Sequence, residues 1–253
     1  MSEWDRPTRL YLIRHGESAP NITPIMGGMR GDSGLTPVGV SQAERLRDRL
    51  EATGEIAADV LIASPLPRAR QTAEIIAQAL RLPLLMDDEV QEIRVGEADG
   101  LHPDEARARY GWNGTPDVYQ PIAPGGESAG EFLLRVGRAL TRIVHQHAGK
   151  TVVIICHGGV IDGSLTCFMG LSTLRGSPVH LHTQPTSITG WEHRVAEEGR
   201  SPWWLLGYND ALHLRVLHSP GSAWQNRADA PRTGDARTAV LGTPEDAGTE
   251  NGL

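Results

Sequence analysis

Cationic and imidazole side chains stand directly after three apolar segments of the chain. Arg14 and His15 follow "LYLI", Arg68 comes shortly after "VLIA", and His157 follows "TVVIIC". Guanidinium groups match the oxygens of a phosphoryl dianion, and a neutral imidazole nitrogen can attack phosphorus. These residue types therefore predict a site for phosphoryl chemistry.

Two glycines adjoin the histidines in the sequence. Gly16 follows His15, and Gly158 follows His157. A residue without a side chain lets the backbone approach an anion closely and present its N–H group. We expect both glycines to donate these N–H groups to the anion.

The three apolar segments are continuous and rich in β-branched residues, namely Leu10–Ile13, Val60–Ala63 and Thr151–Cys156. Continuous apolar runs are typical of parallel strands that are covered on both faces. Ligands of open α/β sheets bind beyond the carboxyl ends of such strands. The charged residues are therefore expected to meet at one edge of the sheet.

Helical patterns separate these strands. Thr36 is a predicted N-cap with Pro37 after it and Gly54 as the stop, and "PRARQTAEIIAQAL" carries apolar residues on one face. A third helix opens with a capping box from Ser128 to Glu131. The alternation predicts an α/β fold, a three-layer sandwich around a mostly parallel central sheet.

The remaining segments complete a single predicted domain over residues 1–218. Residues 186–193 and 211–217 have strand patterns, the second one that of an edge strand. Residues 95–123 form a loop-rich insert with a short helix near "PDEARARY". Residues 219–253 have almost no apolar periodicity and are expected to be a disordered C-terminal tail.

Composition narrows the function. The net charge of −7 argues against nucleic-acid and membrane partners. The sequence contains no long apolar run and no signal-peptide pattern, so we expect a cytoplasmic protein. Cys156 and Cys167 are the only cysteines, which excludes a cysteine-rich metal site. No nucleotide-binding glycine motif follows a strand, so we expect no cofactor and no metal. A homodimer remains an open alternative.

Six sequence pieces together resemble the histidine phosphatase superfamily, also called phosphoglycerate mutase-like. They are "LIRHGES" with Asn21, "GLTPVGVSQA", "SPLPRARQTAEIIA", "QEIRVGEADG", "PGGES" and "ICHGG". They occur in the family's order from about residue 8 to residue 165. A single Arg-His-Gly tripeptide is weak evidence, whereas six pieces in register are specific. The resemblance implies the phosphoglycerate mutase-like fold, and we favour its phosphatase branch.

The resemblance also implies roles for individual residues. His15 would be the nucleophile that becomes phosphohistidine, while Arg14, Arg68 and His157 would hold the phosphoryl oxygens. Glu92 would protonate the leaving oxygen and then activate water.

Two further residues are assigned to substrate binding. Asn21 would add a hydrogen bond to the phosphoryl group, and Glu17 would orient its neighbours. Glu92 is preferred over the other acidic residues of its loop, which are Asp87, Asp88, Glu89 and Glu97.

Two other patterns in the sequence are rejected. "GDSG" at residues 31–34 resembles a serine-protease signature, but the surrounding pattern is α/β and no matching histidine and aspartate accompany it. His180 and His182 have the spacing of one strand face, but no third metal ligand lies near them in the sequence.

The leading hypothesis is a metal-independent phosphomonoesterase that hydrolyses a small phosphorylated metabolite through phosphohistidine. One alternative is a phosphoglycerate mutase. Family mutases carry a long basic insert before the "PGGES"-type segment, whereas only about 34 residues separate Glu92 from Glu127 here, so the phosphatase is preferred. Another alternative is a non-catalytic module that binds a phospholigand or a protein, for which the pair Trp203 and Trp204 would be a candidate surface.

Overall fold

The structure, a computed structural model, describes residues 6–114, 117–172, 181–194 and 202–215. The chain divides into two units, Met1–Arg215 and Val216–Leu253, and all described residues belong to the first. The predicted tail and His180 lie outside the described residues. The predicted domain boundary at residue 218 therefore stays a prediction.

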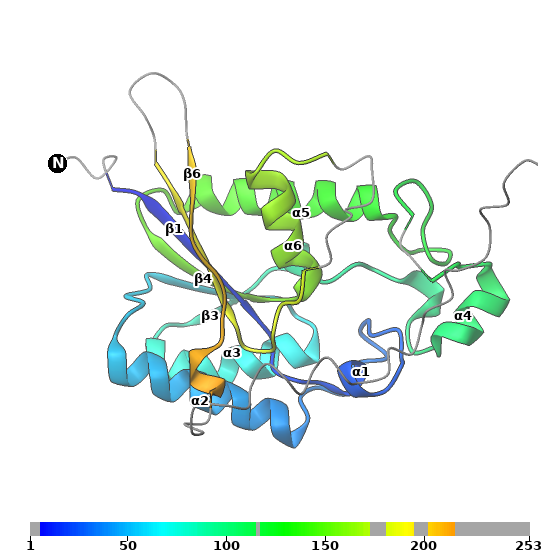
Figure 1. Cartoon of the computed structure of the whole chain (residues 1–253), viewed down its shortest axis with the longest axis horizontal. Coiled ribbons are helices and arrows are strands. Elements are labelled where there is room, and N and C mark those ends of the chain that lie inside the picture. The colour runs from blue at the N-terminus through cyan, green and yellow to red at the C-terminus, as the bar shows by residue number, and fades with distance from the viewer. Residues whose placement is uncertain (1–5, 115–116, 173–180, 195–201, 216–253) are drawn as a thin grey trace, which may run out of the picture. The chain divides into compact units, whose positions relative to one another are not determined.

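A six-stranded mixed sheet forms the centre of the first unit (Figure 1). The strand order is β3-β2-β4-β1-β5-β6, in which β3, β2, β4 and β1 are parallel and β5 and β6 are antiparallel to their neighbours. The strands are β1 (Thr8–Arg14), β2 (Val60–Ala63), β3 (Leu84–Met86), β4 (Thr151–Cys156), β5 (Ile188–His193) and β6 (Trp203–Asp210).

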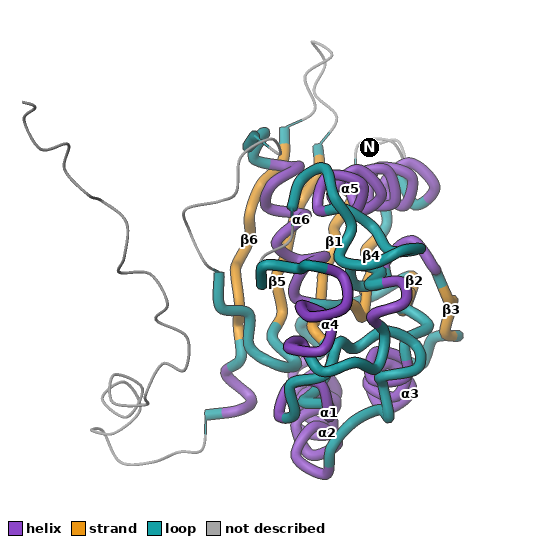
Figure 2. Tube along the Cα trace, turned by 90° about the vertical axis from the view of Figure 1, so that its right-hand side faces the viewer, coloured by secondary structure: helices purple, strands orange, loops and turns teal. Residues whose placement is uncertain are grey.

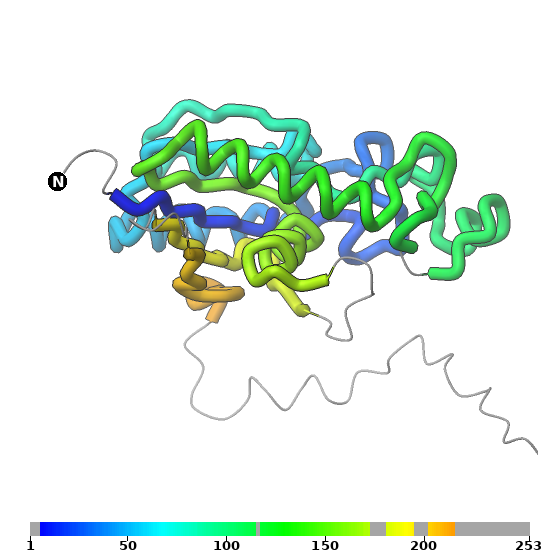
Figure 3. Tube along the Cα trace, turned by 90° about the horizontal axis from the view of Figure 1, so that it is seen from above, coloured from blue at the N-terminus to red at the C-terminus, as the bar shows by residue number. Residues whose placement is uncertain are grey.

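Helices cover both faces of the sheet, as Figures 1 and 2 show. The helices are α1 (Ala19–Ile22), α2 (Pro37–Thr53), α3 (Pro67–Leu80), α4 (Pro103–Tyr110), α5 (Ala129–Gln146) and α6 (Gly158–Phe168). Helices α2 and α3 lie on one face, and α5 and α6 lie on the other. Seen from above, α5 extends over the strands (Figure 3). The predicted three-layer α/β fold is confirmed.

The strand side chains alternate between two buried clusters. Ile154 packs with α5 and α6, whereas Val153 and Ile155 pack with α2 and α3. Because successive strand residues point to opposite faces, a strand covered on both sides must be apolar at every position. This is the physical reason for the continuous apolar runs in the sequence.

The predicted helix boundaries agree with the local hydrogen bonds. The Thr36 hydroxyl accepts a hydrogen bond from the Gly39 N–H, and Gly54 ends α2 with a φ of 60°. Ser128 and Glu131 form the predicted capping box at the start of α5. The short helix near "PDEARARY" is α4. Strand β3 and helix α6 were not part of the sequence prediction.

One strand prediction is wrong. Residues 211–217 were expected to form the edge strand, but Leu212–Leu214 form a 3-10 helix, and β6 is the edge strand. The Asp210 carboxylate accepts a hydrogen bond from the Leu212 N–H at the start of this turn. It also pairs with Arg49 on α2, at 2.6 Å. Strand β6 thus ends at Asp210, where the apolar alternation had suggested that a strand begins.

The insert at residues 95–123 packs around a small buried cluster of its own. Val95, Ala98, Ala106, Ile122 and Ala123 form this cluster. The Asp99 carboxylate accepts hydrogen bonds from the backbone N–H groups of Gly28 and Gly31, at 2.9 and 2.8 Å. The insert therefore holds the loop that follows α1.

Candidate active site

The structure brings the two predicted histidines together. His15 directly follows β1 and His157 directly follows β4, and these strands are parallel neighbours in which Arg14 is paired with Cys156. The centroids of the two imidazole rings lie 5.2 Å apart. Both rings are buried, His15 with 3% and His157 with 0% of its surface exposed. Adjacent parallel strands thus deliver both imidazoles to one edge of the sheet.

Hydrogen bonds define the tautomer of His15. Its Nδ1 lies 2.7 Å from the Gly16 carbonyl oxygen, which only accepts, so Nδ1 carries the proton. Its Nε2 accepts a hydrogen bond from Arg68 Nε, at 3.1 Å. Nε2 therefore holds the lone pair, as a nucleophile for phosphorus requires.

Burial keeps this imidazole neutral. It lowers the pKa of His15 well below its ordinary value of 6.5, and the positive charges of Arg68 and Arg14 lower it further. Burial also lowers the pKa of His157, with further contributions from Arg68 and His15. Both imidazoles are consequently unprotonated at neutral pH.

Arg68 is held by a buried carboxylate. Its NH1 group donates to Asp32 at 2.8 Å, and its backbone N–H donates to the same oxygen at 3.2 Å. The Asp32 side chain is fully buried, and that of Arg68 is 5% exposed. The other Asp32 oxygen accepts from the Gly34 N–H, at 2.8 Å. Asp32 thus fixes the guanidinium beside His15.

Sequence reasoning missed this role of Asp32. The residue belongs to the "GDSG" segment, which drew attention only as a protease-like pattern. The available signal was an aspartate in a glycine-containing loop, and many surface turns share it. Only the tertiary fold shows that its partner is Arg68, 36 residues away.

Arg14 and His157 offer unused polar atoms at this edge. Among the described residues, Arg14 Nε and His157 Nδ1 are buried and have no hydrogen-bond partner. The opposite end of the Arg14 guanidinium donates to the Thr183 carbonyl. His157 Nε2 shares a hydrogen bond of 2.8 Å with the Ser64 hydroxyl. Buried polar atoms without partners are costly, and phosphoryl oxygens would satisfy these two.

Glu92 lies beside the start of α6. Its Oε2 accepts a hydrogen bond from the Gly159 N–H, and its Oε1 accepts one from the Ile93 N–H, each at 3.0 Å. A Cβ atom at position 159 would lie 2.2 Å from Glu92 Oε1, so a glycine is required for this approach. The carboxyl group is thereby held near the helix turn that follows His157.

A buried arginine anchors the loop that carries Glu92. Arg135 on α5 makes a two-pronged ion pair with Glu127, with both N–O distances at 2.7 Å. It also donates to the carbonyl oxygens of Glu89, Gln91 and Glu92. Sequence reasoning did not assign this role, because an arginine on a helix usually faces solvent.

The two predicted glycines, Gly16 and Gly158, lie in different surroundings. The N–H of Gly16 is expected to bind the anion; in this structure it donates to the Thr72 hydroxyl, at 3.0 Å, and its role in anion binding stays a prediction. A Cβ at Gly16 would lie 2.5 Å from the Gly39 carbonyl oxygen, so the glycine is needed for packing against α2. Gly158 begins α6 beside Arg14, with open space around its Cα. Its role in anion binding stays a prediction.

Asn21 and Glu17 bond to the surrounding chain. The Asn21 side-chain oxygen accepts from the Ser18 N–H at 3.0 Å, and Asn21 itself is exposed on α1. The Glu17 carboxylate accepts a hydrogen bond from the Thr36 hydroxyl, at 2.7 Å, and so steadies the start of α2. These contacts fit the orienting role expected of Glu17, and substrate binding by either residue stays a prediction.

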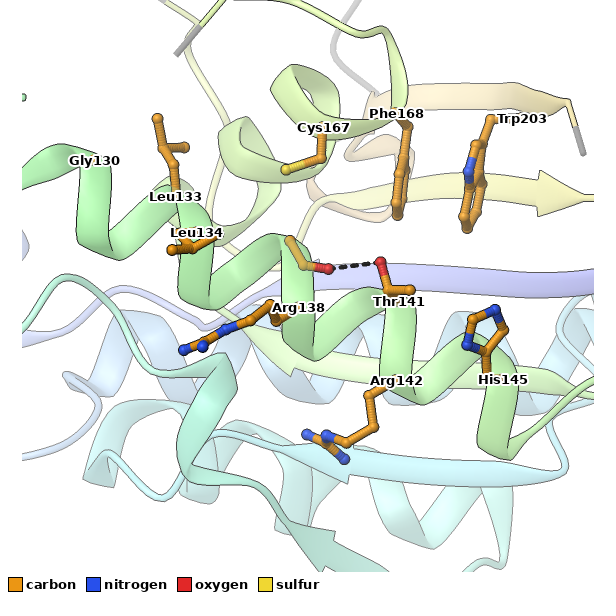
Figure 4. A pocket seen from close by; sticks show the side chains of 11 residues that line it. Gly130, Leu133, Leu134, Arg138, Thr141, Arg142, His145, Cys167, Phe168 and Trp203 are labelled. Carbon is orange, nitrogen blue, oxygen red and sulfur yellow. Dashed lines mark hydrogen bonds between the residues drawn. The ribbon is translucent and has the colours of Figure 1, made fainter. Parts of the chain in front are cut away.

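A separate groove with a volume of about 680 Å³ lies between α5, α6 and β6 (Figure 4). Its apolar wall includes Leu134, Phe168 and Trp203, and the last two rings stack 3.6 Å apart. Arg138 adds positive charge, and His145 also lines the groove. None of the predicted site residues lines this groove.

Within the described ranges, no helix combines the length and apolarity needed to cross a bilayer.

Comparison with known proteins agrees with this geometry. The family model of the histidine phosphatase superfamily (branch 1) matches residues 10–209. The chain is 31% identical over 207 residues to the uncharacterized phosphatase PhoE of Bacillus subtilis (strain 168), covering 82% of this chain and 97% of PhoE. It is 34% identical over 178 residues to the 2,3-bisphosphoglycerate-dependent phosphoglycerate mutase of Methylobacterium sp. (strain 4-46), covering 65% of this chain and 82% of the mutase.

Solved structures show the same likeness. YhfR of Bacillus stearothermophilus superposes with a TM-score of 0.66 and 30% identity, covering 82% of this chain and 100% of YhfR. A phosphoserine phosphatase of Entamoeba histolytica, crystallised with phosphoserine, has a TM-score of 0.61 and 25% identity, with the same coverage. The extent of these matches, together with paired histidines at the ends of neighbouring parallel strands, shows that the chain belongs to branch 1 of the histidine phosphatase superfamily.

Proposed function

We propose that this protein is a metal-independent phosphomonoesterase that hydrolyses small phosphorylated metabolites through a phosphohistidine at His15. The observation that carries the proposal is the tautomer of His15, whose Nδ1 proton is bonded to the Gly16 carbonyl and whose Nε2 keeps its lone pair and accepts a hydrogen bond from Arg68. Family membership supports phosphatase or mutase chemistry on phosphorylated small molecules.

In the first step, His15 Nε2 attacks the phosphorus and the ester P–O bond breaks. Arg14, Arg68 and His157 stabilise the charge on the phosphoryl oxygens during transfer. Glu92 donates its proton to the leaving oxygen, which departs as an alcohol. The product is phosphohistidine with Glu92 as a carboxylate.

In the second step, the Glu92 carboxylate takes a proton from a water molecule as that water attacks the phosphorus. The P–N bond breaks, inorganic phosphate leaves and His15 regains its lone pair. The proton received by Glu92 restores the acid for the next cycle. One ester and one water thus give one alcohol and one phosphate.

A phosphoglycerate mutase is the second candidate, and the 34% identity to such an enzyme favours it. In that reaction the phosphohistidine returns its phosphoryl group to a hydroxy acid that stays bound. The short segment between Glu92 and Glu127 contains few basic residues, Arg94, His102, Arg107 and Arg109, to hold such an acid. Two of these have acidic partners on α4 itself, since Arg107 pairs with Asp104 and Arg109 with Glu105. We therefore favour hydrolysis.

The test uses p-nitrophenyl phosphate and an alkyl phosphate with EDTA present, then 3-phosphoglycerate with a bisphosphoglycerate primer. Phosphate release that His15→Ala abolishes, together with loss of the acid-labile phosphoryl label, supports hydrolysis. Isomerisation of 3-phosphoglycerate as the main reaction would support the mutase instead. Phospholigand binding without turnover would support the non-catalytic module.

The role of Glu92 is tested separately by the leaving group. Glu92→Gln should slow turnover of the alkyl phosphate much more than that of p-nitrophenyl phosphate, because nitrophenolate leaves without a proton. Equal activity of parent and variant on the alkyl phosphate would show that Glu92 is not the acid.

A further inference from the structure

Asp162 is a second carboxyl group beside the site, and the proposed mechanism does not use it. It lies on α6, four residues after Gly158 and three after Gly159. Residues three and four apart share one face of a helix, and helical side chains lean toward the N-terminus. The Asp162 carboxyl group therefore lies over the first turn of α6.

That face of α6 meets two site residues. The nearest atom to a Cβ built at Gly158 is Arg14 Nε, at 3.9 Å, and the N–H of Gly159 donates to Glu92. Glu92 and Arg14 are also the charged groups that act on Asp162 most strongly. Since Glu92 is the proposed proton donor to the leaving alcohol, Asp162 lies on the leaving-group side of the phosphoryl position.

One oxygen of the Asp162 carboxyl group has no hydrogen-bond donor among the described residues. Its Oδ1 is buried and has no partner among the described residues, as is true of Arg14 Nε and His157 Nδ1. The oxygens of a bound phosphoryl group would accept a hydrogen bond from Arg14. They cannot satisfy a carboxylate oxygen, which only accepts. A hydroxyl on the alcohol part of the substrate can supply a donor to Asp162.

Charge strengthens this argument. Burial and the neighbouring Glu92 raise the pKa of Asp162 to about 6, while Arg14 opposes the rise. Above that pH the group is an anion next to a second carboxyl group. An anionic substituent on the leaving alcohol would be repelled there, and a hydroxyl substituent would be bound.

We propose that Asp162 determines specificity by accepting a hydrogen bond from a hydroxyl of the leaving alcohol and by repelling a carboxylate at that position. The substrate class is then the phosphate monoester of a neutral polyhydroxy alcohol, such as a sugar or polyol phosphate. This inference rests on the proposed phosphatase function. It also predicts that phosphoglycerates are poor substrates for this chain.

The experiment compares three phosphate esters that share a three-carbon skeleton. Propyl phosphate lacks hydroxyls, glycerol 3-phosphate has a hydroxymethyl group at its far end, and 3-phosphoglycerate has a carboxylate there. We measure kcat/KM for each with the full-length parent, Asp162→Asn, Asp162→Ala and the control Asp48→Asn. Asp48 lies on α2 with its side chain 64% exposed. Ratios between substrates cancel any loss of active protein in a variant.

In Asp162→Asn, the ratio for 3-phosphoglycerate over propyl phosphate should rise about tenfold, the change that one pKa unit of interaction produces. In Asp162→Ala, the ratio for glycerol 3-phosphate over propyl phosphate should fall by about the same factor. Asp48→Asn should leave both ratios at the parent values. Ratios that stay unchanged in both Asp162 variants would overturn the inference.

The parent enzyme separates this inference from the proposed function. A parent that releases phosphate from none of the three esters, nor from p-nitrophenyl phosphate, overturns the phosphatase proposal and the inference with it. An active parent with unchanged ratios in the Asp162 variants overturns the inference alone.

Discussion

Replacing Asp32 by asparagine should disturb both the stability of the fold and the chemistry at His15. The substitution keeps the shape of the side chain and removes its negative charge. Asp32 makes three hydrogen bonds, two to Arg68 and one to the Gly34 N–H. An asparagine has only one accepting oxygen, so its NH2 group would face a donor on one side.

The size of the effect follows from burial. The Asp32 side chain is fully buried and that of Arg68 is 5% exposed, so the guanidinium would lose its counter-charge where water cannot replace it. Breaking such a buried pair costs about 3 to 5 kcal/mol. With a urea m-value of about 2 kcal/mol/M, the midpoint of unfolding should fall by about 1.5 M or more.

Catalysis should suffer as well. Arg68 donates to Nε2 of His15 through the same guanidinium that Asp32 holds. If Arg68 turns away, the transition state loses one charged hydrogen-bond donor, and removal of one such donor costs about 100-fold in kcat. We therefore expect kcat/KM for an alkyl phosphate to fall by about that factor in protein that is still folded.

Glu74→Gln is the matched control for this experiment. Glu74 pairs with Arg70 on the same helix α3 at 2.7 Å, but their side chains are 49% and 60% exposed. An exposed pair contributes less than about 1 kcal/mol, so this variant should melt and react like the parent. If Asp32→Asn behaves like Glu74→Gln in both assays, the buried ion pair does not organise the site and our reasoning is refuted.

Two further predictions follow from the buried groups around the site. Arg135→Lys keeps the charge but loses the planar fork, so the Glu92 loop should loosen: kcat should fall while KM changes little, and a double-mutant cycle with Glu127→Gln should be non-additive. Independent, additive effects would contradict this coupling. The second concerns pH. Burial lowers the pKa of His15 and His157 in the folded state, whereas the unfolded chain binds protons near pH 6.5, so stability is highest above that pH and falls as the pH drops below it. The free energy of unfolding from urea titrations between about pH 6.5 and pH 5.5 should decline by up to about 1.4 kcal/mol per pH unit for each such histidine, and less steeply in His157→Asn. Equal slopes in parent and variant would show that His157 is not buried in its neutral form.

Local sequence was sufficient for the framework of the molecule. The apolar runs predict β1, β2 and β4 because strands covered on both faces must be apolar throughout. Thr36, Gly54 and Ser128 mark helix ends through contacts within a few residues. Histidines and arginines placed directly after such strands must lie at one edge of the sheet.

Tertiary structure decided the contacts between distant segments. Strand β3 has only three residues, Leu84–Met86, and its pattern differs little from that of a loop. The alternation in residues 211–217 suggested a strand, but Asp210 accepts a hydrogen bond from the Leu212 N–H and pairs with Arg49 there.

Within the site, too, local sequence predicted some residues and tertiary contacts decided the others. The order of the motifs was enough to nominate His15 and His157, since each position depends on the strand that precedes it. Asp32 and Asp162 resemble ordinary loop and helix carboxylates in sequence, and their significance depends on which distant charges surround them. Burial turns those charges into strong interactions, and burial is a property of the folded chain alone.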